Sequence, residues 1–220
     1  MIKGIIYDLD DVIINSIGLH IQASDMVFAE YGVQQDKVNL SDKLKASLLG
    51  RRVIDVMKIL IKHYKIKASP EEIHQRREEI FYQLAKDKLE LLPGVKESIK
   101  LFREHDYKMA IASSATKKLI HLVLSKFELL HLFPEVVAAE DIQRGKPNPE
   151  VYQLAAKKLV LEPSECVVLE DANNGIKAAK KAGCKCIAIR NQYVPEQNLS
   201  KADLLVDSLN DITTLMIKKL

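Results

Sequence analysis

Tryptophan is absent from this chain of 220 residues, and cysteine, proline and glycine are scarce, at three, seven and eight residues. So little glycine and proline excludes a collagen-like or low-complexity chain. No stretch approaches the roughly 18 consecutive apolar residues that cross a bilayer. Lys3, Asp8 and Asp10 interrupt the apolar N-terminus, so we do not interpret it as a signal peptide. We expect a soluble, cytoplasmic protein with no membrane partner.

Charge of one sign is not in excess either. The 33 Lys and Arg and the 30 Asp and Glu residues give a net charge of +3 and are interleaved along the chain, so nucleic acid is not an expected partner. Cys166, Cys184 and Cys186 are odd in number and lack C-x-x-C spacing. We interpret them as reduced, buried, small apolar side chains, with metal binding as the weaker alternative.

Hydrophobic periodicity divides the chain into two kinds of segment. Residues 2–8 form a short apolar run that ends in acid, as a buried strand does. From about residue 17, apolar residues recur at helical spacing as far as Pro93-Gly94. Helices and strands then alternate: we expect helices at 95–105, 116–126, 148–159 and 173–182, strands at 107–112, 135–139, 166–169 and 185–189, a short strand near 204–206 and a last helix.

This order of segments predicts an α/β fold. Nearly all-apolar strands that alternate with helices are typical of a parallel sheet covered on both faces. The helical segment lies between the first strand and the rest, so we interpret it as an insertion. We expect a core made of residues 1–15 and 91–220, and an all-helical insertion at 16–90.

Polar residues follow the predicted strands, where the carboxyl ends of a parallel sheet form a binding crevice. They are Asp8, Asp10 and Asp11, then Ser113 and Ser114, then Lys146, then Glu170 and Asp171. Two carboxylates about 4 Å apart repel by roughly 4 kcal/mol at an effective dielectric near 20, so the acids need a cation, and oxygen ligands favour Mg²⁺ over zinc. Each acid alone is better explained as a helix cap or turn residue. Agreement at four strand ends favours a site for a divalent cation and a phosphate.

In order, these residues are Asp8-Leu9-Asp10, Ser113, Lys146 within Gly-Lys-Pro-Asn-Pro, and Glu170-Asp171 followed by Asn-Gly-Ile. The chain resembles the haloacid dehalogenase superfamily over essentially its whole length. More narrowly, it is similar to the branch with a helical cap, which holds small-molecule phosphatases and β-phosphoglucomutases. The resemblance implies a Rossmann-like catalytic core with the insertion as its cap.

The resemblance also implies catalytic roles. Asp8 is the expected nucleophile, forming an aspartyl-phosphate, and Asp10 the expected general acid and base. Mg²⁺ is the expected cofactor; its implied ligands are Asp8, the backbone carbonyl of Asp10, Asp171 and, as a ligand or acceptor beside it, Glu170. Ser113 is expected to hold phosphate oxygens and Lys146 to oppose their charge. Taken alone, Lys146 is better explained as a solvated loop lysine; the acidic strand ends and the neighbouring Pro147 favour an inward orientation.

The chain departs from the family pattern at two positions. Asp11 replaces the usual Gly after the second Asp, and Asn15 replaces a frequent Asp before Ser. Because Asp tolerates left-handed or turn geometry better than most residues, we interpret Asp11 as a local accommodation of the backbone. An extra negative charge there is also expected to influence the metal or substrate preference.

Candidate substrate-binding residues are fewer and weaker. In the cap they are His20, near the chain crossing, and Arg51 and Arg52, which with Gly50 interrupt an apolar helix; Ser114 is a fourth, with a turn or cap role as its alternative. His20 is equally consistent with a packing residue. Arg76-Arg77 are interpreted as a solvated helix face, and Lys117-Lys118 as facing water.

The leading hypothesis is a Mg²⁺-dependent phosphatase for a small phosphorylated metabolite such as a sugar or polyol phosphate, acting as a monomer or weak homodimer. A mutase of the β-phosphoglucomutase kind is the alternative, because fold and core motifs are shared. A receiver-type signalling domain needs little more than half this length and no insertion. A halide-releasing enzyme needs no metal and leaves Asp10 and Glu170-Asp171 without a role. A silent binding protein is disfavoured because every chemical position is filled.

Overall fold

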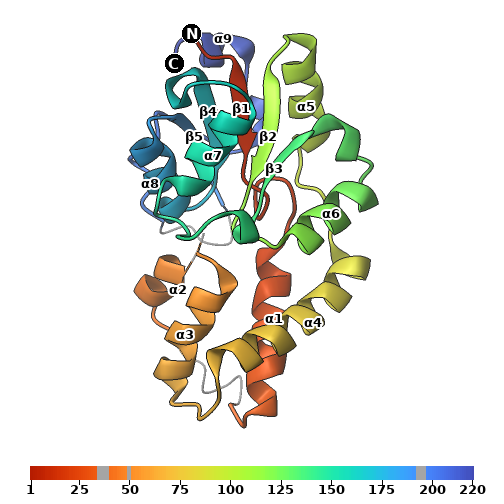
Figure 1. Cartoon of the computed structure of the whole chain (residues 1–220), viewed down its shortest axis with the longest axis vertical. Coiled ribbons are helices and arrows are strands. Elements are labelled where there is room, and N and C mark those ends of the chain that lie inside the picture. The colour runs from red at the N-terminus through yellow and green to blue at the C-terminus, as the bar shows by residue number, and fades with distance from the viewer. Residues whose placement is uncertain (34–39, 49–50, 192–196) are drawn as a thin grey trace.

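The computed structural model describes residues 1–33, 40–48, 51–191 and 197–220. Six parallel strands form one sheet in the order β3-β2-β1-β4-β5-β6, which confirms the predicted parallel α/β architecture (Figure 1). The strands are β1 (Gly4–Tyr7), β2 (Lys108–Ala112), β3 (Glu135–Val137), β4 (Cys166–Glu170), β5 (Lys185–Ile189) and β6 (Leu204–Val206).

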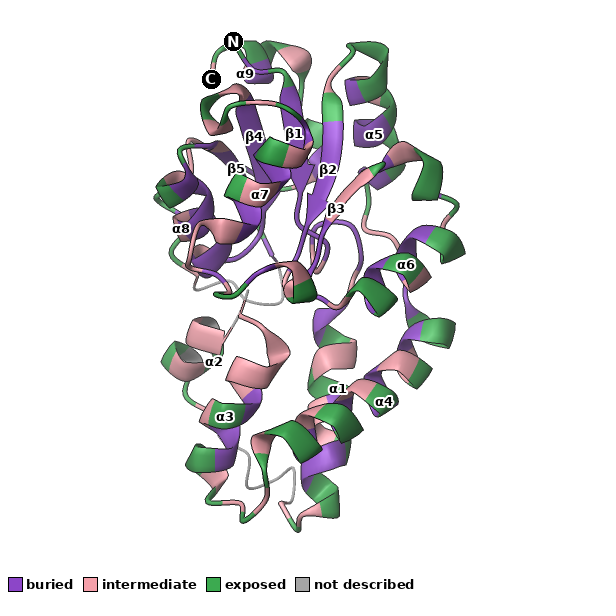
Figure 2. Ribbon diagram, in the orientation of Figure 1, coloured by how far each residue is buried: buried purple, intermediate pink, exposed green. Residues whose placement is uncertain are grey.

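The sheet is covered on both faces because alternate residues of its apolar strands point to opposite sides. Ile5 and Tyr7 belong to one hydrophobic cluster and Ile6 to the other. The first cluster includes residues of α5 (Val95–Glu104), α6 (Lys117–Lys126) and α9 (Thr214–Lys218), and the second includes residues of α7 (Glu150–Lys158) and α8 (Asn173–Ala182). Figure 2 shows the strands as the most continuously buried part of the chain. All three cysteines are buried and free, as predicted.

Two predicted boundaries are wrong by about two residues. The helix expected at 148–159 begins at Glu150, because Asn148 lies between two prolines and its side chain accepts the Glu150 amide at 3.1 Å. The strand expected at 135–139 ends at Val137. The chain turns there into a 3₁₀ helix at Ala139–Asp141, in which the Asp141 carboxylate accepts the Ala138 amide at 3.0 Å.

Between β1 and β2 the chain forms the predicted helical insertion, with α1 (Ile17–Glu30), α2 (Asp42–Leu48), α3 (Val53–Tyr64) and α4 (Pro70–Lys88). Pro70 begins α4, and the Ser69 hydroxyl accepts the Glu72 amide at 3.1 Å, so a proline in the first turn and a serine N-cap start this helix. Figure 1 shows the four helices gathered beyond the carboxyl ends of the strands. We call them the cap and the rest the core; the limits at residues 15/16 and 90/91 stay a prediction.

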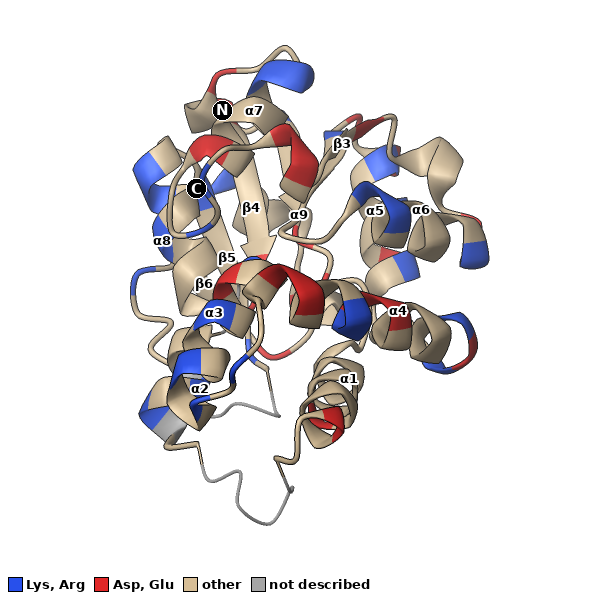
Figure 3. Cartoon of the chain, turned by 60° about the horizontal axis from the view of Figure 1, so that its bottom comes forward, with Lys and Arg blue, Asp and Glu red and all other residues tan. Residues whose placement is uncertain are grey.

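The two chain crossings between core and cap run side by side. Asn15 donates its amide to the Glu90 carbonyl at 3.0 Å, and Leu92 donates to the Ile13 carbonyl at 2.9 Å. Basic and acidic residues both occur in the core and in the cap (Figure 3). Within the described residues, no helix combines the length and apolar character needed to cross a bilayer.

Candidate active site

The predicted acidic residues converge at the carboxyl end of the sheet. Asp8 directly follows β1 and donates its amide to the Leu169 carbonyl at 3.0 Å, so it lies next to the end of β4. Glu170 ends β4 and Asp171 follows it. All three carboxyl groups are buried, and one oxygen of each lies within 4.8 Å of the others.

The electrostatics of this cluster call for a positive charge. Burial raises the pKa of Asp8 to about 8, even though Lys146 acts in the opposite direction and Glu170 adds to the rise. Burial also raises the pKa of Asp171 well above its usual range, reinforced by Glu170 and Asp11. Hard carboxylate oxygens that repel one another in a buried site fit a divalent cation such as Mg²⁺ or Ca²⁺. The cluster is therefore a candidate metal-binding group.

Lys146 points into this cluster and not into water. Its Nζ lies 2.9 Å from Asp8 Oδ1 and 2.6 Å from Glu170 Oε1. Burial lowers the pKa of Lys146, but the two carboxylates more than offset this and raise it above its usual value. The two carboxylates therefore favour the cationic form of Lys146 beside Asp8.

Glu170 is held by a set of partners that the sequence analysis did not predict. The Tyr152 hydroxyl donates to Oε1 at 2.8 Å, and the Ala172 amide donates to Oε2 at 2.8 Å. A Cβ at Gly175 would lie 1.6 Å from Glu170 Oε1. Gly175 therefore leaves the space that the carboxylate fills.

Asp171 also has a partner that the sequence analysis did not predict: Asn191, beyond β5, donates to Asp171 Oδ2 at 3.0 Å. No local pattern marks Tyr152 or Asn191, whose roles arise from strand and helix packing.

Asp10 faces the cap, where His20 and Arg77 form a chain behind it. His20 Nε2 lies 3.1 Å from Asp10 Oδ1, and its ring stacks on Phe81 at 4.2 Å between centroids. His20 Nδ1 contacts Arg77 Nη2. Burial raises the pKa of Asp10, but His20, with smaller contributions from Ser16 and Lys146, acts in the opposite direction, so the net pKa is lowered.

The prediction that Arg77 lies on a solvated helix face is wrong. Arg77 is only 2% exposed, because α4 packs this side against α1 and the guanidinium lies over the Phe81 ring at 4.9 Å. Arg76 is exposed as predicted and pairs with Glu30 and Glu79. One residue step separates the two arginines, and helical periodicity alone does not decide which of them faces α1.

Asp11 adopts the left-handed conformation, with φ of 58°, which confirms the expected accommodation at the position where the family has Gly. Its carboxylate accepts the amides of Ser16 and Ile17, both at 3.2 Å. Asp11 therefore also caps the start of α1. Its side chain shapes the connection to the cap.

The remaining candidates lie around these groups. Ser113 is buried after β2, where its hydroxyl accepts the Ala115 amide at 3.0 Å, and Ser114 is half-buried in the same turn. Lys117 and Lys118 are exposed.

Of the cap candidates, Gly50 lies outside the described residues. Arg51 donates to the Ser47 carbonyl at 2.8 Å, and Arg52 contacts Asp55 and the Gln143 carbonyl. The hydrogen bonds described for these two arginines thus join them to residues other than the acidic cluster.

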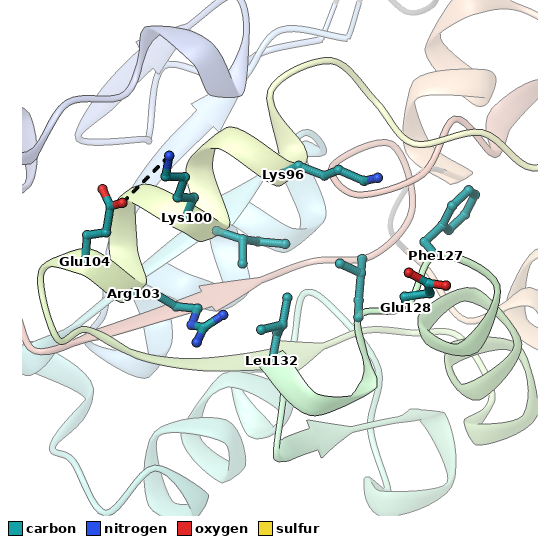
Figure 4. Close-up of a pocket in the computed structure, with 9 residues that line it drawn as sticks. Lys96, Lys100, Arg103, Glu104, Phe127, Glu128 and Leu132 are labelled. Carbon is teal, nitrogen blue, oxygen red and sulfur yellow. Dashed lines mark ion pairs between the residues drawn. The ribbon is translucent and has the colours of Figure 1, made fainter.

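A separate hollow of about 540 Å³ lies between α5 and residues 127–132. Its walls carry Lys96, Lys100 and Arg103 beside apolar side chains (Figure 4). None of its lining residues belongs to the acidic cluster, and the sequence analysis did not predict it.

The six-stranded parallel sheet carries a helical insertion after its first strand, and acids, a serine and a lysine lie at its strand ends. This is the architecture of a Rossmann-like protein with a helical cap and an acidic site beneath it. The family model described as haloacid dehalogenase-like hydrolase matches residues 5–189. The chain belongs to this family, as its motifs predicted.

Known relatives agree with this assignment. Hexitol phosphatase B of Escherichia coli is 31% identical over 215 residues, which are 96% of this chain and 95% of the relative. The crystal structure of CbbY from Rhodobacter sphaeroides in complex with phosphate is 26% identical, with a TM-score of 0.86 and full coverage of both chains. A second CbbY structure, with xylulose-(1,5)bisphosphate, gives a TM-score of 0.83 at 26% identity over 95% of each chain. β-Phosphoglucomutase from Clostridium difficile gives a TM-score of 0.84 at 25% identity, covering 100% of this chain and 96% of the other.

Proposed function

We propose that this haloacid dehalogenase-like phosphatase hydrolyses a small phosphorylated metabolite, a sugar or polyol phosphate, through an aspartyl-phosphate on Asp8. The observation that carries the proposal is the buried Asp8 carboxylate, paired with Lys146 at 2.9 Å and placed beside Glu170 and Asp171. A hexitol phosphatase and a CbbY protein that binds phosphate and a sugar bisphosphate are similar over nearly the whole chain. Their ligands support the substrate class.

Two displacements at phosphorus account for the residues present. In the first, an Asp8 carboxylate oxygen attacks phosphorus, the ester P–O bond breaks, and Asp10, protonated once the phosphate ester is bound, gives its proton to the leaving oxygen. In the second, Asp10 takes a proton from water, whose oxygen attacks phosphorus, and phosphate leaves Asp8. Lys146 and Ser113 hold the phosphate oxygens beside Asp8. His20 lies 3.1 Å from Asp10 and holds its carboxylate toward the cap.

The acidic cluster fits Mg²⁺ as cofactor. Asp8 and Asp171 would hold it together with the backbone carbonyl of Asp10, while Glu170, already bonded to Lys146, Tyr152 and Ala172, supports them. When bound, the ion neutralises carboxylate and phosphate charge. Activity is expected to disappear with a chelator and to return with Mg²⁺, while Ca²⁺, with its longer and looser coordination, inhibits. Full turnover in excess chelator would remove the metal from the proposal.

The direct test is a screen of purified protein with Mg²⁺ against phosphorylated metabolites, with release of inorganic phosphate as the readout. Sugar and polyol phosphates should be hydrolysed faster than nucleotides or phosphoproteins. A preference for a substrate outside the phosphorylated carbohydrates would overturn the proposed substrate class while leaving the phosphatase chemistry intact.

The variant Asp10→Asn tests the acid-base assignment. Because Asn keeps the backbone carbonyl, metal binding should persist, while both displacements slow by about 10²- to 10⁴-fold. Calorimetric Mg²⁺ binding and single-turnover phosphate release would measure the two properties separately. A variant with the wild-type rate would assign the acid to another group.

A phosphosugar mutase is the second candidate, favoured by the similarity to β-phosphoglucomutase along the whole chain. In that reaction, the aspartyl-phosphate passes its phosphoryl group to a sugar phosphate in place of water. The product distinguishes the two: free phosphate for the phosphatase, or an isomerised sugar phosphate formed with a bisphosphate activator for the mutase.

A further inference from the structure

Arg52 joins the cap to the core. Its Nε and Nη2 donate to the Asp55 carboxylate, at 2.9 and 3.4 Å, on the first turn of α3. Its Nη1 donates to the backbone carbonyl of Gln143 in the core, at 3.2 Å. The guanidinium is planar and Asp55 holds one of its edges, so the remaining N–H groups have a fixed direction. Arg52 is therefore aimed at the loop that precedes α7.

Gly145 leaves room for the aliphatic part of the Arg52 side chain. A Cβ at position 145 would lie 2.8 Å from Arg52 Cγ and 3.2 Å from Cδ. The backbone φ of Gly145 is outside the left-handed region, so its conformation does not itself require glycine. What requires the missing side chain is the close approach of the cap.

The same loop carries Lys146, the residue after Gly145. Lys146 points inward to Asp8 and Glu170, whereas Arg52 contacts the loop from the cap side. The Glu150 carboxylate holds the amides of Gln143 and Arg144 from α7, at 2.8 and 3.0 Å. With these amides occupied, the Gln143 carbonyl is left to face the cap.

We propose that Arg52 is a positioning residue, which clamps residues 143–145 when the cap rests on the core and so holds Lys146 against Asp8. The inference rests on the proposed function, because that function places Lys146 beside the transferred phosphate. It differs from the substrate-binding role expected from the sequence. If Arg52 acts through Lys146, its loss affects every phosphate ester; if it touches the substrate, its loss affects only substrates large enough to reach it.

The kinetic test compares Arg52→Ala on a sugar phosphate and on p-nitrophenyl phosphate. We expect kcat to fall by the same factor on both, on the order of 10- to 100-fold, since small misplacements of catalytic groups have effects of that size. Arg52→Lys should restore little, because one ammonium group cannot hold Asp55 and Gln143 together. Arg76→Ala is the matched control: it removes an exposed cap arginine whose partners, Glu30 and Glu79, lie within the cap. A rise in KM confined to the sugar phosphate would overturn the proposal.

Gly145→Ala tests the same contact without removing Arg52. It should lower kcat to a similar extent, and the double variant Arg52→Ala/Gly145→Ala should be no worse than either single one, since both remove one interaction. Fully additive losses would contradict the proposal. Thermal melting of each variant separates these effects from loss of the fold.

Hydrogen–deuterium exchange provides a readout that does not depend on turnover. The backbone amides of residues 143–146 and 148 should exchange faster in Arg52→Ala and Gly145→Ala than in the wild type and in Arg76→Ala. Unchanged exchange in both variants would overturn the proposal even if activity fell. Faster exchange in a protein without phosphatase activity would support the clamp and refute the proposed function, so the two failures are distinguishable.

Discussion

We call the carboxyl end of the sheet, with Asp8, Lys146, Glu170 and Asp171, the rim. Charged side chains at the rim and in the cap differ in how deeply they are buried. At the rim, Asp8, Lys146 and Glu170 are almost fully buried and contact one another. In the cap, the ion pairs of Arg76 with Glu30 and Glu79 join side chains that are all more than 40% exposed. Charges buried without water need mutual neutralisation, whereas exposed pairs contribute little. The buried charges of the rim therefore serve its chemistry, whereas the exposed pairs of Arg76 lie away from it.

Arg77 is buried, in contrast to Arg76, and it marks a place where the cap takes part in the site. Its guanidinium is buried against Phe81 and contacts His20, whose other nitrogen faces Asp10. The difference between Arg77 and its neighbour Arg76 shows that the useful cap residues are those that reach the rim.

Asp8→Asn should produce the greatest loss. Without the carboxylate nucleophile, steady-state phosphate release should fall by about 10⁴-fold or more. The fold should remain. Burial raises the pKa of Asp8 because it disfavours the charged carboxylate, and a neutral asparagine avoids that cost, so the melting temperature should equal or exceed that of the wild type. Substantial turnover would show that another rim group attacks the phosphate.

Gly175→Ala should cause the second-largest loss of activity, although it adds only one methyl group. That group would overlap Glu170 Oε1 and displace a carboxylate bonded to Lys146 and Tyr152. We expect kcat to drop by about 100-fold and Mg²⁺ affinity, measured by calorimetry, to weaken.

Gly18→Ala is the matched control for this change. Gly18 lies in α1, where an added Cβ would meet no neighbouring atom within 4 Å, and alanine is the better helix former by about 1 kcal/mol. This variant should bind Mg²⁺ normally and melt at a higher temperature. Equal Mg²⁺ binding by the wild type, the control and Gly175→Ala would mean that Glu170 is free to move.

The rim could be predicted from the sequence because strand order and strand ends determine it. A residue that follows a buried parallel strand lies at the carboxyl edge whatever its neighbours do, so Asp8, Ser113 and Asp171 were placed from the chain alone. The helical insertion was visible for a similar reason, since no strand pattern occurs between β1 and β2.

The cap side chains could not be placed in this way. Their positions depend on how helices far apart in the sequence rotate against one another: α4 turns Arg77, and not Arg76, toward α1. Arg52 meets the loop before α7 through a contact between residues 91 positions apart. Tyr152 and Asn191 reach the rim in the same non-local manner, and no periodicity of a single segment carries that information.

Arg77→Ala compared with Arg76→Ala tests the contrast within the cap. The buried arginine loses its packing on Phe81 and its hydrogen bonds to His20 and Glu78, so the free energy of unfolding should fall by about 2–3 kcal/mol. The exposed arginine should cause little change. Urea denaturation of both variants measures this, and similar results for the two would mean that burial of Arg77 contributes nothing.

Asp11→Gly should have the smallest effect, because two contributions oppose each other. Glycine relieves the left-handed backbone at φ 58°, worth about 1 kcal/mol, but loses the carboxylate that accepts the Ser16 and Ile17 amides, also worth about 1 kcal/mol. Stability in urea should therefore change by less than about 1 kcal/mol, and phosphate release should stay within a few-fold of the wild type. Asp11→Ala keeps the strain and loses the cap of α1, so it should be the less stable of the two. If Asp11→Gly instead lowers activity more than Asp11→Ala does, a rigid backbone at this crossing contributes more to turnover than the hydrogen bonds between the Asp11 carboxylate and the start of α1. That result would assign position 11 a role in catalysis together with the rim.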